Sequence, residues 1–127
     1  MKILLLGKNG QLGWALQCSL AILGEVVACD RTEADLENLE QLQAVIRKVS
    51  PQIIVNAAAY TAVDKAESEP ERAFLINSKA VDLLAQEARL LNAWLIHYST
   101  DYVFDGTKES PYLETDATHP ISIYGKT

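Results

Sequence analysis

The chain has 127 residues, of which 49% are hydrophobic, and a formal net charge of −6 at pH 7. This length and apolar share suit one ordinary globular domain. Because phosphate backbones attract clustered Lys and Arg, the acidic balance argues against a nucleic-acid-binding protein, although backbone amides can still bind a phosphate group locally.

Hydrophobic runs along the chain are short. The longest, residues 3–6 and 53–59, fall far short of the roughly 20 apolar residues that span a bilayer. The N-terminus lacks the apolar core of about 7–15 residues and the small-residue cleavage site of a secretory signal. We therefore expect a cytoplasmic protein with no membrane partner.

Two kinds of residue suit packing rather than chemistry. Cys18 and Cys29 have neither metal-ligand nor redox spacing, so we expect small buried apolar residues and no metal site. Trp14 and Trp94 are predicted to be core or interface aromatics.

Short apolar runs alternate with segments of helical periodicity. Residues 2–6 predict a parallel strand buried on both faces. Leu12, Leu16 and Leu20 recur at helical spacing and predict a helix from residue 10 to about 23, with Gly24 as its C-cap. Further segments predict strands at residues 25–29, 53–56 and 94–99, helices at 39–50 (stopped by Pro51) and 70–91, and a loop at 101–120. This order predicts an α/β fold, with a doubly wound parallel sheet and helices on both faces.

A glycine-rich turn joins the first strand to the first helix. Gly7, Gly10 and Gly13 follow at a spacing of three and three. Each has a mechanical reason in a dinucleotide site: a tight turn at Gly7, close approach of a pyrophosphate at Gly10, and close helix-to-strand packing at Gly13. The free amides and partial positive charge of the helix N-terminus favour phosphate.

The second strand ends with an acidic and a basic residue. Asp30 lies 17 residues beyond Gly13, where a carboxylate accepts hydrogen bonds from the adenosine ribose hydroxyls of NAD. Arg31 follows directly, and a guanidinium there can pair with the 2′-phosphate of NADP. The sequence leaves the choice between NADH and NADPH open.

Two further segments are more specific than a nucleotide fold: NAAAYTAVDKAE at residues 56–67 and STDYVFDG at residues 99–106. With the glycine turn and the closing YGKT at residues 124–127, the chain resembles the dTDP-4-dehydrorhamnose reductases, which are extended short-chain dehydrogenases/reductases, over its whole length. The resemblance implies that residues 1–127 are a Rossmann-type NAD(P)-binding domain, incomplete because the last strands and the C-terminal substrate-binding part are absent.

The resemblance also implies a reaction. These enzymes transfer hydride from NADPH or NADH to the C4 ketone of a dTDP-sugar, dTDP-4-dehydro-L-rhamnose, and give dTDP-L-rhamnose for cell-surface polysaccharide. Hydride addition leaves an alkoxide, so a proton donor must lie beside the oxygen. Tyr124 matches the family's proton donor. Thr100 matches the family's hydroxyl that hydrogen-bonds the substrate carbonyl, and Asp101 matches a neighbouring substrate contact.

The family's lysine partner of the tyrosine would follow Thr127, and Lys126 is expected to point elsewhere. We therefore expect the 127-residue chain to bind cofactor without turnover. The resemblance and the motifs together assign the cofactor contacts to Gly7, Gly10, Gln11, Leu12, Gly13, Asp30, Arg31, Asp35, Leu36, Ala57, Ala58, Ala59, Tyr60, Thr61 and Tyr124.

Two other functions fit the same segments. One is another nucleotide-sugar reductase or epimerase of the superfamily. The other is a non-catalytic regulatory subunit of this fold, like the one attached to methionine adenosyltransferase in eukaryotes; the presence of both Tyr124 and Thr100 argues against it. Because the fourth strand would lack its outer neighbour, we also expect a homodimer or edge-paired assembly.

Overall fold

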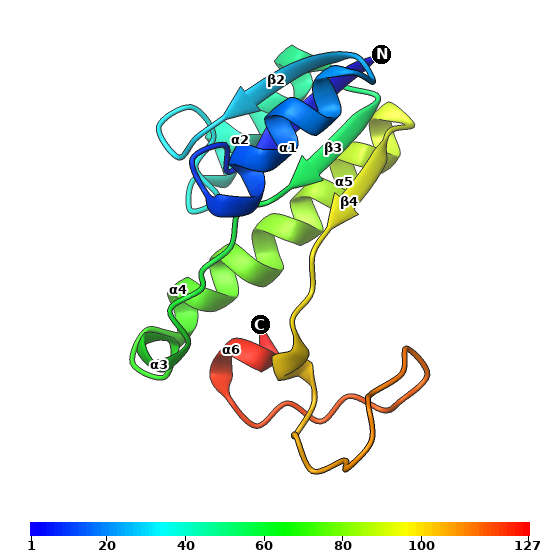
Figure 1. Ribbon diagram of the computed structural model, residues 1–127. Helices are drawn as coiled ribbons and strands as arrows, with labels where there is room; N and C mark the ends of the chain where they lie inside the picture. The colour runs from blue at the N-terminus through cyan, green and yellow to red at the C-terminus, as the bar shows by residue number, and fades with distance from the viewer.

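Four hydrophobic segments form a parallel sheet in the computed structural model, which describes residues 1–127 (Figure 1). The strands are β1 (Lys2–Leu6), β2 (Glu25–Cys29), β3 (Ile53–Asn56) and β4 (Trp94–His97). They lie in the order β2-β1-β3-β4, and Leu4 of β1 is opposite both Val27 and Ile54. The predicted doubly wound α/β fold is confirmed.

Helices cover the two faces of the sheet unequally. In Figure 1, α1 (Gln11–Ala21) lies in front of the sheet, while α2 (Leu39–Val49) and α5 (Ala80–Leu91) lie behind it. The buried side chains behind the sheet form the larger cluster, which includes Leu4, Leu6, Leu42, Ile46, Ile54 and Leu84. On the α1 side, Ile3, Leu5 and Val55 pack with Leu16 and Leu20. The central strand β1 is therefore buried on both faces, as its uninterrupted apolar run predicted.

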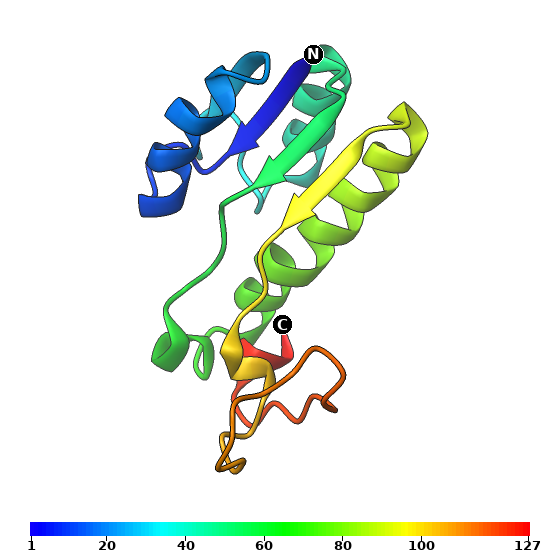
Figure 2. The same ribbon diagram turned by 45° about the vertical axis from the view of Figure 1, so that its right-hand side comes forward.

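The helix predicted at residues 70–91 is continuous but not uniform. It consists of α4 (Pro70–Phe74), a π-helical segment (Leu75–Lys79) and α5. The helix extends past the carboxyl ends of the strands, where α3 (Val63–Ala66) and α6 (Ile123–Lys126) lie against its first turns (Figure 2). None of the helices combines the length and the hydrophobicity that a bilayer span requires.

Two predicted boundaries were wrong. The helix α1 ends at Ala21, and its C-cap is Ile22 rather than Gly24. A glycine at position 24 lets the backbone pass close to Met1, because a Cβ there would lie 2.1 Å from the Met1 carbonyl oxygen. The strand β4 ends at His97, and within the predicted loop only residues Asp101–Val103 form a 3₁₀ turn.

Both cysteines were expected to be buried, and Trp14 and Trp94 to lie in the core or at an interface. Cys29 is buried, but Cys18 is exposed, and Trp14 and Trp94 are 70% and 77% exposed. α1 carries apolar residues around most of its circumference, so its composition does not reveal which of them face the sheet. Trp94 lies opposite Ile53 on the part of the α1 side that α1 does not cover.

Candidate functional site

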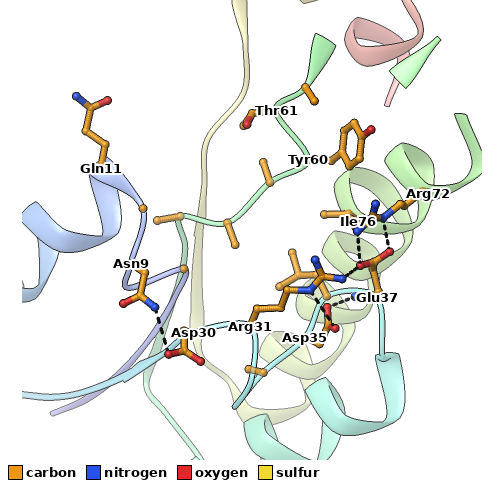
Figure 3. Close-up of a pocket in the computed structure, with 18 residues that line it drawn as sticks. Asn9, Gln11, Asp30, Arg31, Asp35, Glu37, Tyr60, Thr61, Arg72 and Ile76 are labelled. Carbon is orange, nitrogen blue, oxygen red and sulfur yellow. Dashed lines mark hydrogen bonds and ion pairs between the residues drawn. The ribbon is translucent and has the colours of Figure 1, made fainter. Parts of the chain in front are cut away.

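A cleft of about 680 Å³ lies beyond the carboxyl ends of β1, β2 and β3 (Figure 3). The chain leaves β1 for β2 on one side and returns to β3 on the other, so the cleft is at the topological switch point, where doubly wound sheets bind ligands. The predicted site residues that line it are Gly7, Gly10, Gln11, Asp30, Arg31, Asp35, Leu36, Ala57, Ala58, Ala59, Tyr60 and Thr61.

The glycine turn forms one wall of this cleft. Gly7 has φ +83°, and a Cβ there would lie 2.9 Å from the carbonyl oxygen of Ala57. At Gly13 a Cβ would lie 2.0 Å from the carbonyl oxygen of Gly7. The tight turn and the close helix packing predicted for these two residues are confirmed.

The N-terminus of α1 borders the cleft and has no side-chain cap. Gly10 is the N-cap residue. Gln11 lines the cleft, whereas Leu12 and Gly13 do not. Since the amides carry the positive end of the helix dipole, this corner can bind an anionic group through backbone atoms alone.

Asp30 is held in a turn at the end of β2. Its Oδ1 accepts hydrogen bonds from the Thr32 hydroxyl at 2.6 Å and the Thr32 amide at 2.9 Å, and its Oδ2 accepts one from Asn9 at 3.2 Å. The Nζ of Lys8 lies 3.5 Å away. The Thr32 donors in particular hold the pKa of Asp30 at about 2, so the carboxylate is charged at neutral pH.

Arg31 does not reach toward Asp30. Its Nε lies 3.3 Å from Asp35, and its terminal nitrogen pairs with Glu37. The guanidinium therefore lies along the β2–α2 loop (Figure 3).

The third wall of the cleft is residues 57–61, and Asn77 fixes it. The Oδ1 of Asn77 accepts a hydrogen bond from the Tyr60 amide at 2.8 Å, and its Nδ2 donates one to the Tyr60 carbonyl at 3.1 Å. Asn77 belongs to the π-helical segment of the long helix, and π-helical turns are frequent at functional sites. The sequence analysis did not identify this residue.

A smaller pocket of about 250 Å³ adjoins the cleft at Ala59, which lines both. Thr100 and Tyr124 line this pocket together, although 24 residues separate them in the sequence. The Thr100 hydroxyl also caps the 3₁₀ turn by accepting a hydrogen bond from the Tyr102 amide at 3.2 Å. Lys126 is also among the residues that line the pocket, and Asp101 lines neither pocket.

Several cleft residues were missed by the sequence analysis: Asn9, Ala34, Glu37, Ala62, Arg72 and Ile76. Asn9 lies within the glycine turn, so its position was a usable signal. Glu37 and Arg72 are 35 residues apart and meet only in the folded chain. No local pattern marks such a pair.

The doubly wound sheet, the glycine turn and the cleft at the switch point define a class, the α/β proteins with a Rossmann-type nucleotide-binding fold. Within that class, the chain belongs to the family described as the RmlD substrate binding domain, whose sequence profile matches residues 1–127.

Individual relatives agree with this family. The dTDP-4-dehydrorhamnose reductase of Escherichia coli (strain K12) is 54% identical over 131 residues, covering 100% of this chain and 44% of the relative. The enzyme of the same name from Burkholderia thailandensis is 54% identical over 98% of this chain and 42% of its own length. The chain thus spans less than half of these curated relatives.

Solved structures show the same fold. A dTDP-4-dehydrorhamnose reductase from Bacillus anthracis, in complex with NADP, superimposes with a TM-score of 0.92 at 38% identity and covers 98% of this chain and 45% of its own. The UDP-glucose 4-epimerase of Thermus thermophilus has a TM-score of 0.87 at 21% identity, over 99% of this chain and 47% of its own. A likeness at that identity shows the fold alone.

Proposed function

We propose that residues 1–127 form the nicotinamide-cofactor-binding part of a cytoplasmic dTDP-4-dehydrorhamnose reductase. The observation that carries the proposal is the cleft at the switch point, with the Gly7–Gly13 turn against the strand-end backbone at Ala57. The curated relatives of that name, at 54% identity over nearly the whole chain, supply the substrate class.

The cleft offers a place for each part of NADPH or NADH. The uncapped amides of Gln11, Leu12 and Gly13 suit the pyrophosphate. Asp30 and Arg31 suit the adenosine ribose, and Asp35 and Leu36 lie farther along the same wall, where the adenine would contact them. Residues 57–61 line the cleft, and Ala59 among them also lines the smaller pocket, so this segment suits the nicotinamide ribose.

The smaller pocket suits the ketone substrate. The bound cofactor supplies the hydride, which leaves an alkoxide that needs a proton. In our proposal Tyr124 donates this proton, and the Thr100 hydroxyl orients the carbonyl oxygen. Because Asp101 lies outside both pockets, its contact with the substrate requires a sugar that extends past Thr100.

A chimera tests the activity, because the relatives are more than twice as long as this chain. Residues 1–127 would be joined to the remaining part of the Escherichia coli relative, and NADPH oxidation measured with dTDP-4-dehydro-L-rhamnose. We expect turnover, and a loss of about 100-fold or more in the Tyr124→Phe chimera, the usual scale of general acid catalysis.

A folded chimera that binds NADPH but does not reduce this sugar would contradict the proposal. Turnover with another nucleotide sugar would then identify a different reductase or epimerase of the superfamily. No turnover with any sugar would favour the non-catalytic regulatory subunit.

A further inference from the structure

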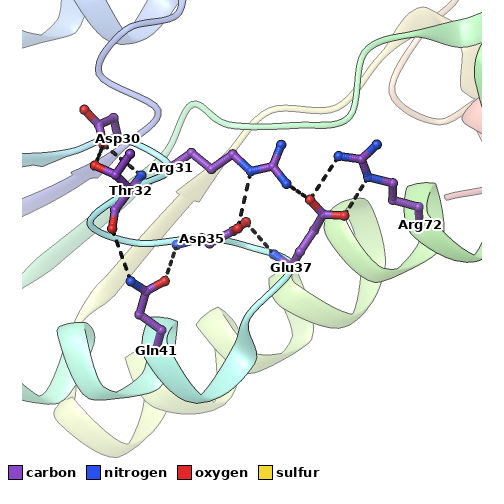
Figure 4. Close-up of polar contacts among 7 residues, drawn as sticks. All are labelled: Asp30, Arg31, Thr32, Asp35, Glu37, Gln41 and Arg72. Atoms are coloured by element: carbon purple, nitrogen blue, oxygen red, sulfur yellow. Dashed lines mark hydrogen bonds and ion pairs between the residues drawn. The ribbon is translucent and has the colours of Figure 1, made fainter.

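A chain of charged side chains crosses one end of the cleft (Figure 4). Arg31 contacts Asp35 and Glu37, Glu37 contacts Arg72, and Arg72 lies 3.4 Å from Glu69. Arg31, Asp35, Glu37 and Arg72 all line the cleft. The network is therefore part of the surface that a bound cofactor would contact.

The two arginines hold Glu37 differently. Arg72 makes a two-point contact, with Nε 2.6 Å from one carboxylate oxygen and a terminal nitrogen 3.1 Å from the other. Arg31 reaches Glu37 through one terminal nitrogen, and its side chain is 63% exposed against 37% for Arg72. If Arg31 swings away, Glu37 stays paired with Arg72, so Arg31 is the exchangeable partner.

No other cation is free at this end of the cleft. Lys8 pairs with Glu33 and lies 3.5 Å from Asp30. The Asp30 carboxylate would repel a phosphate on the adjacent ribose. A 2′-phosphate there therefore gains a favourable contact only when Arg31 leaves Glu37, whereas a 2′-hydroxyl needs no cation.

We propose that Glu37 sets the preference between NADH and NADPH, by holding Arg31 away from the position of the 2′-phosphate and so disfavouring NADPH. This inference rests on the proposed function, because it requires that the cleft binds a nicotinamide cofactor. It assigns a selectivity role to a residue outside the glycine turn and outside the end of β2.

Equilibrium binding of NADPH and NADH to the 127-residue chain, followed by the fluorescence of the reduced nicotinamide, tests the inference without any turnover. In Glu37→Gln, Arg31 keeps its Nε contact with Asp35 but loses the charged partner of its terminal nitrogen. NADPH binding is expected to tighten about tenfold, the scale of one charge-assisted pair, and NADH binding to stay within about twofold. Glu40→Gln is the matched control, since it removes the same charge from an exposed position in the first turn of α2.

Arg31→Gln provides a second variant that keeps the Glu37–Arg72 contact, in case Glu37→Gln does not fold. It is expected to lower NADPH affinity relative to NADH at least about threefold. In the double variant, the gain from Glu37→Gln should disappear. Equal effects of Glu37→Gln on both cofactors, or an unchanged ratio in Arg31→Gln, overturn the inference while the proposed function stands. A folded wild-type chain that binds neither cofactor overturns both.

Discussion

At the scale of single residues, the cleft depends on two glycines that let backbone segments approach closely. Gly7 adopts a positive φ and lies against Ala57, and Gly13 lies against Gly7. A side chain at either position would meet main-chain atoms, which cannot rotate aside as a flexible side chain can. The β1–α1 turn can therefore lie this close to the end of β3 only because these two positions carry no side chain.

Gly13→Ala tests this packing. Its Cβ would lie 2.0 Å from the Gly7 carbonyl oxygen, so we expect a loss of about 2 kcal/mol or more of unfolding free energy and much weaker NADPH binding. Gly106→Ala is the control, because φ is +75° but no atom lies within 4 Å; it should cost about 1 kcal/mol from backbone strain alone. Thermal unfolding and NADPH titration measure both, and a Gly13→Ala chain with unchanged stability would contradict the packing argument.

Asn77 is the residue whose role in the cleft is least visible in the sequence. Asn77→Ala removes both hydrogen bonds to the Tyr60 backbone, and an unpaired backbone group costs about 1–3 kcal/mol. We expect NADPH affinity to fall about tenfold in a chain that still folds. Ser78→Ala, in the same π-helical segment, is the control in this binding assay and should leave the affinity unchanged. Equal affinities of the Asn77 and Ser78 variants would disprove the role.

At the scale of the elements, an ion pair between the buried Glu87 and the more exposed Arg47 joins α2 to α5 behind the sheet. The Glu87 side chain is 3% exposed and receives two hydrogen bonds from Arg47, at 2.9 and 2.7 Å, and one from Gln43 at 2.7 Å. A buried carboxylate that loses its cation is strongly destabilising. This pair therefore fixes how α2 and α5 lie together behind the sheet.

Arg47→Met is expected to lower the free energy of unfolding, but by less than the loss of one partner from a fully buried pair, because Arg47 is 57% exposed. The double variant with Glu87→Met should recover most of this loss, since no buried charge remains. Denaturant unfolding of both variants measures the difference. A double variant less stable than Arg47→Met would contradict the account.

The same pair predicts a dependence on pH. The hydrogen bonds from Arg47, above all other causes, lower the pKa of Glu87 in the folded chain. A carboxyl with a lowered folded pKa stabilises the fold above its unfolded pKa of about 4.3, and this stabilisation disappears as pH falls through the folded value. The stability advantage of wild type over Glu87→Gln should therefore be full near pH 7 and shrink toward pH 3 in urea unfolding. An advantage that grows in acid would contradict this sign.

Much of the element order follows from the sequence, because uninterrupted apolar runs identify buried strands and the glycine spacing identifies the turn. The π-helical segment could not be predicted, since a locally widened helix leaves the apolar periodicity of residues 70–91 almost unchanged. The contact between Glu37 and Arg72 was equally invisible, because it depends on how the β2–α2 loop lies against α4. Local patterns report elements, while the site also requires contacts between elements.

At the scale of the whole molecule, α1 covers only part of the sheet face on which it packs. α1 packs on β1 and β2, whereas Trp94 and Ile96 of β4 are 77% and 43% exposed on the uncovered part. β4 pairs only with β3, so its other edge presents unpaired backbone groups. An exposed apolar edge strand favours pairing with another chain.

We expect the 127-residue chain to self-associate through this edge, and sedimentation velocity over a range of concentrations measures it. Trp94→Lys should shift the chain toward monomer, because a charge on an edge strand opposes pairing. Leu90→Lys, at a similarly exposed position on α5, should not. Sedimentation as a monomer at high concentration would contradict a dimer formed at β4.

The most direct test of the account is an amide-resolved NMR titration of the chain with NADPH. Binding in the cleft predicts saturable shifts at Gly10–Gly13, at Asp30 and Arg31, and at residues 57–61 on the three walls, with little change at the far ends of the strands. A folded chain whose amide signals do not move, or move only at the opposite end of the sheet, would contradict the assignment of the cleft as a dinucleotide site.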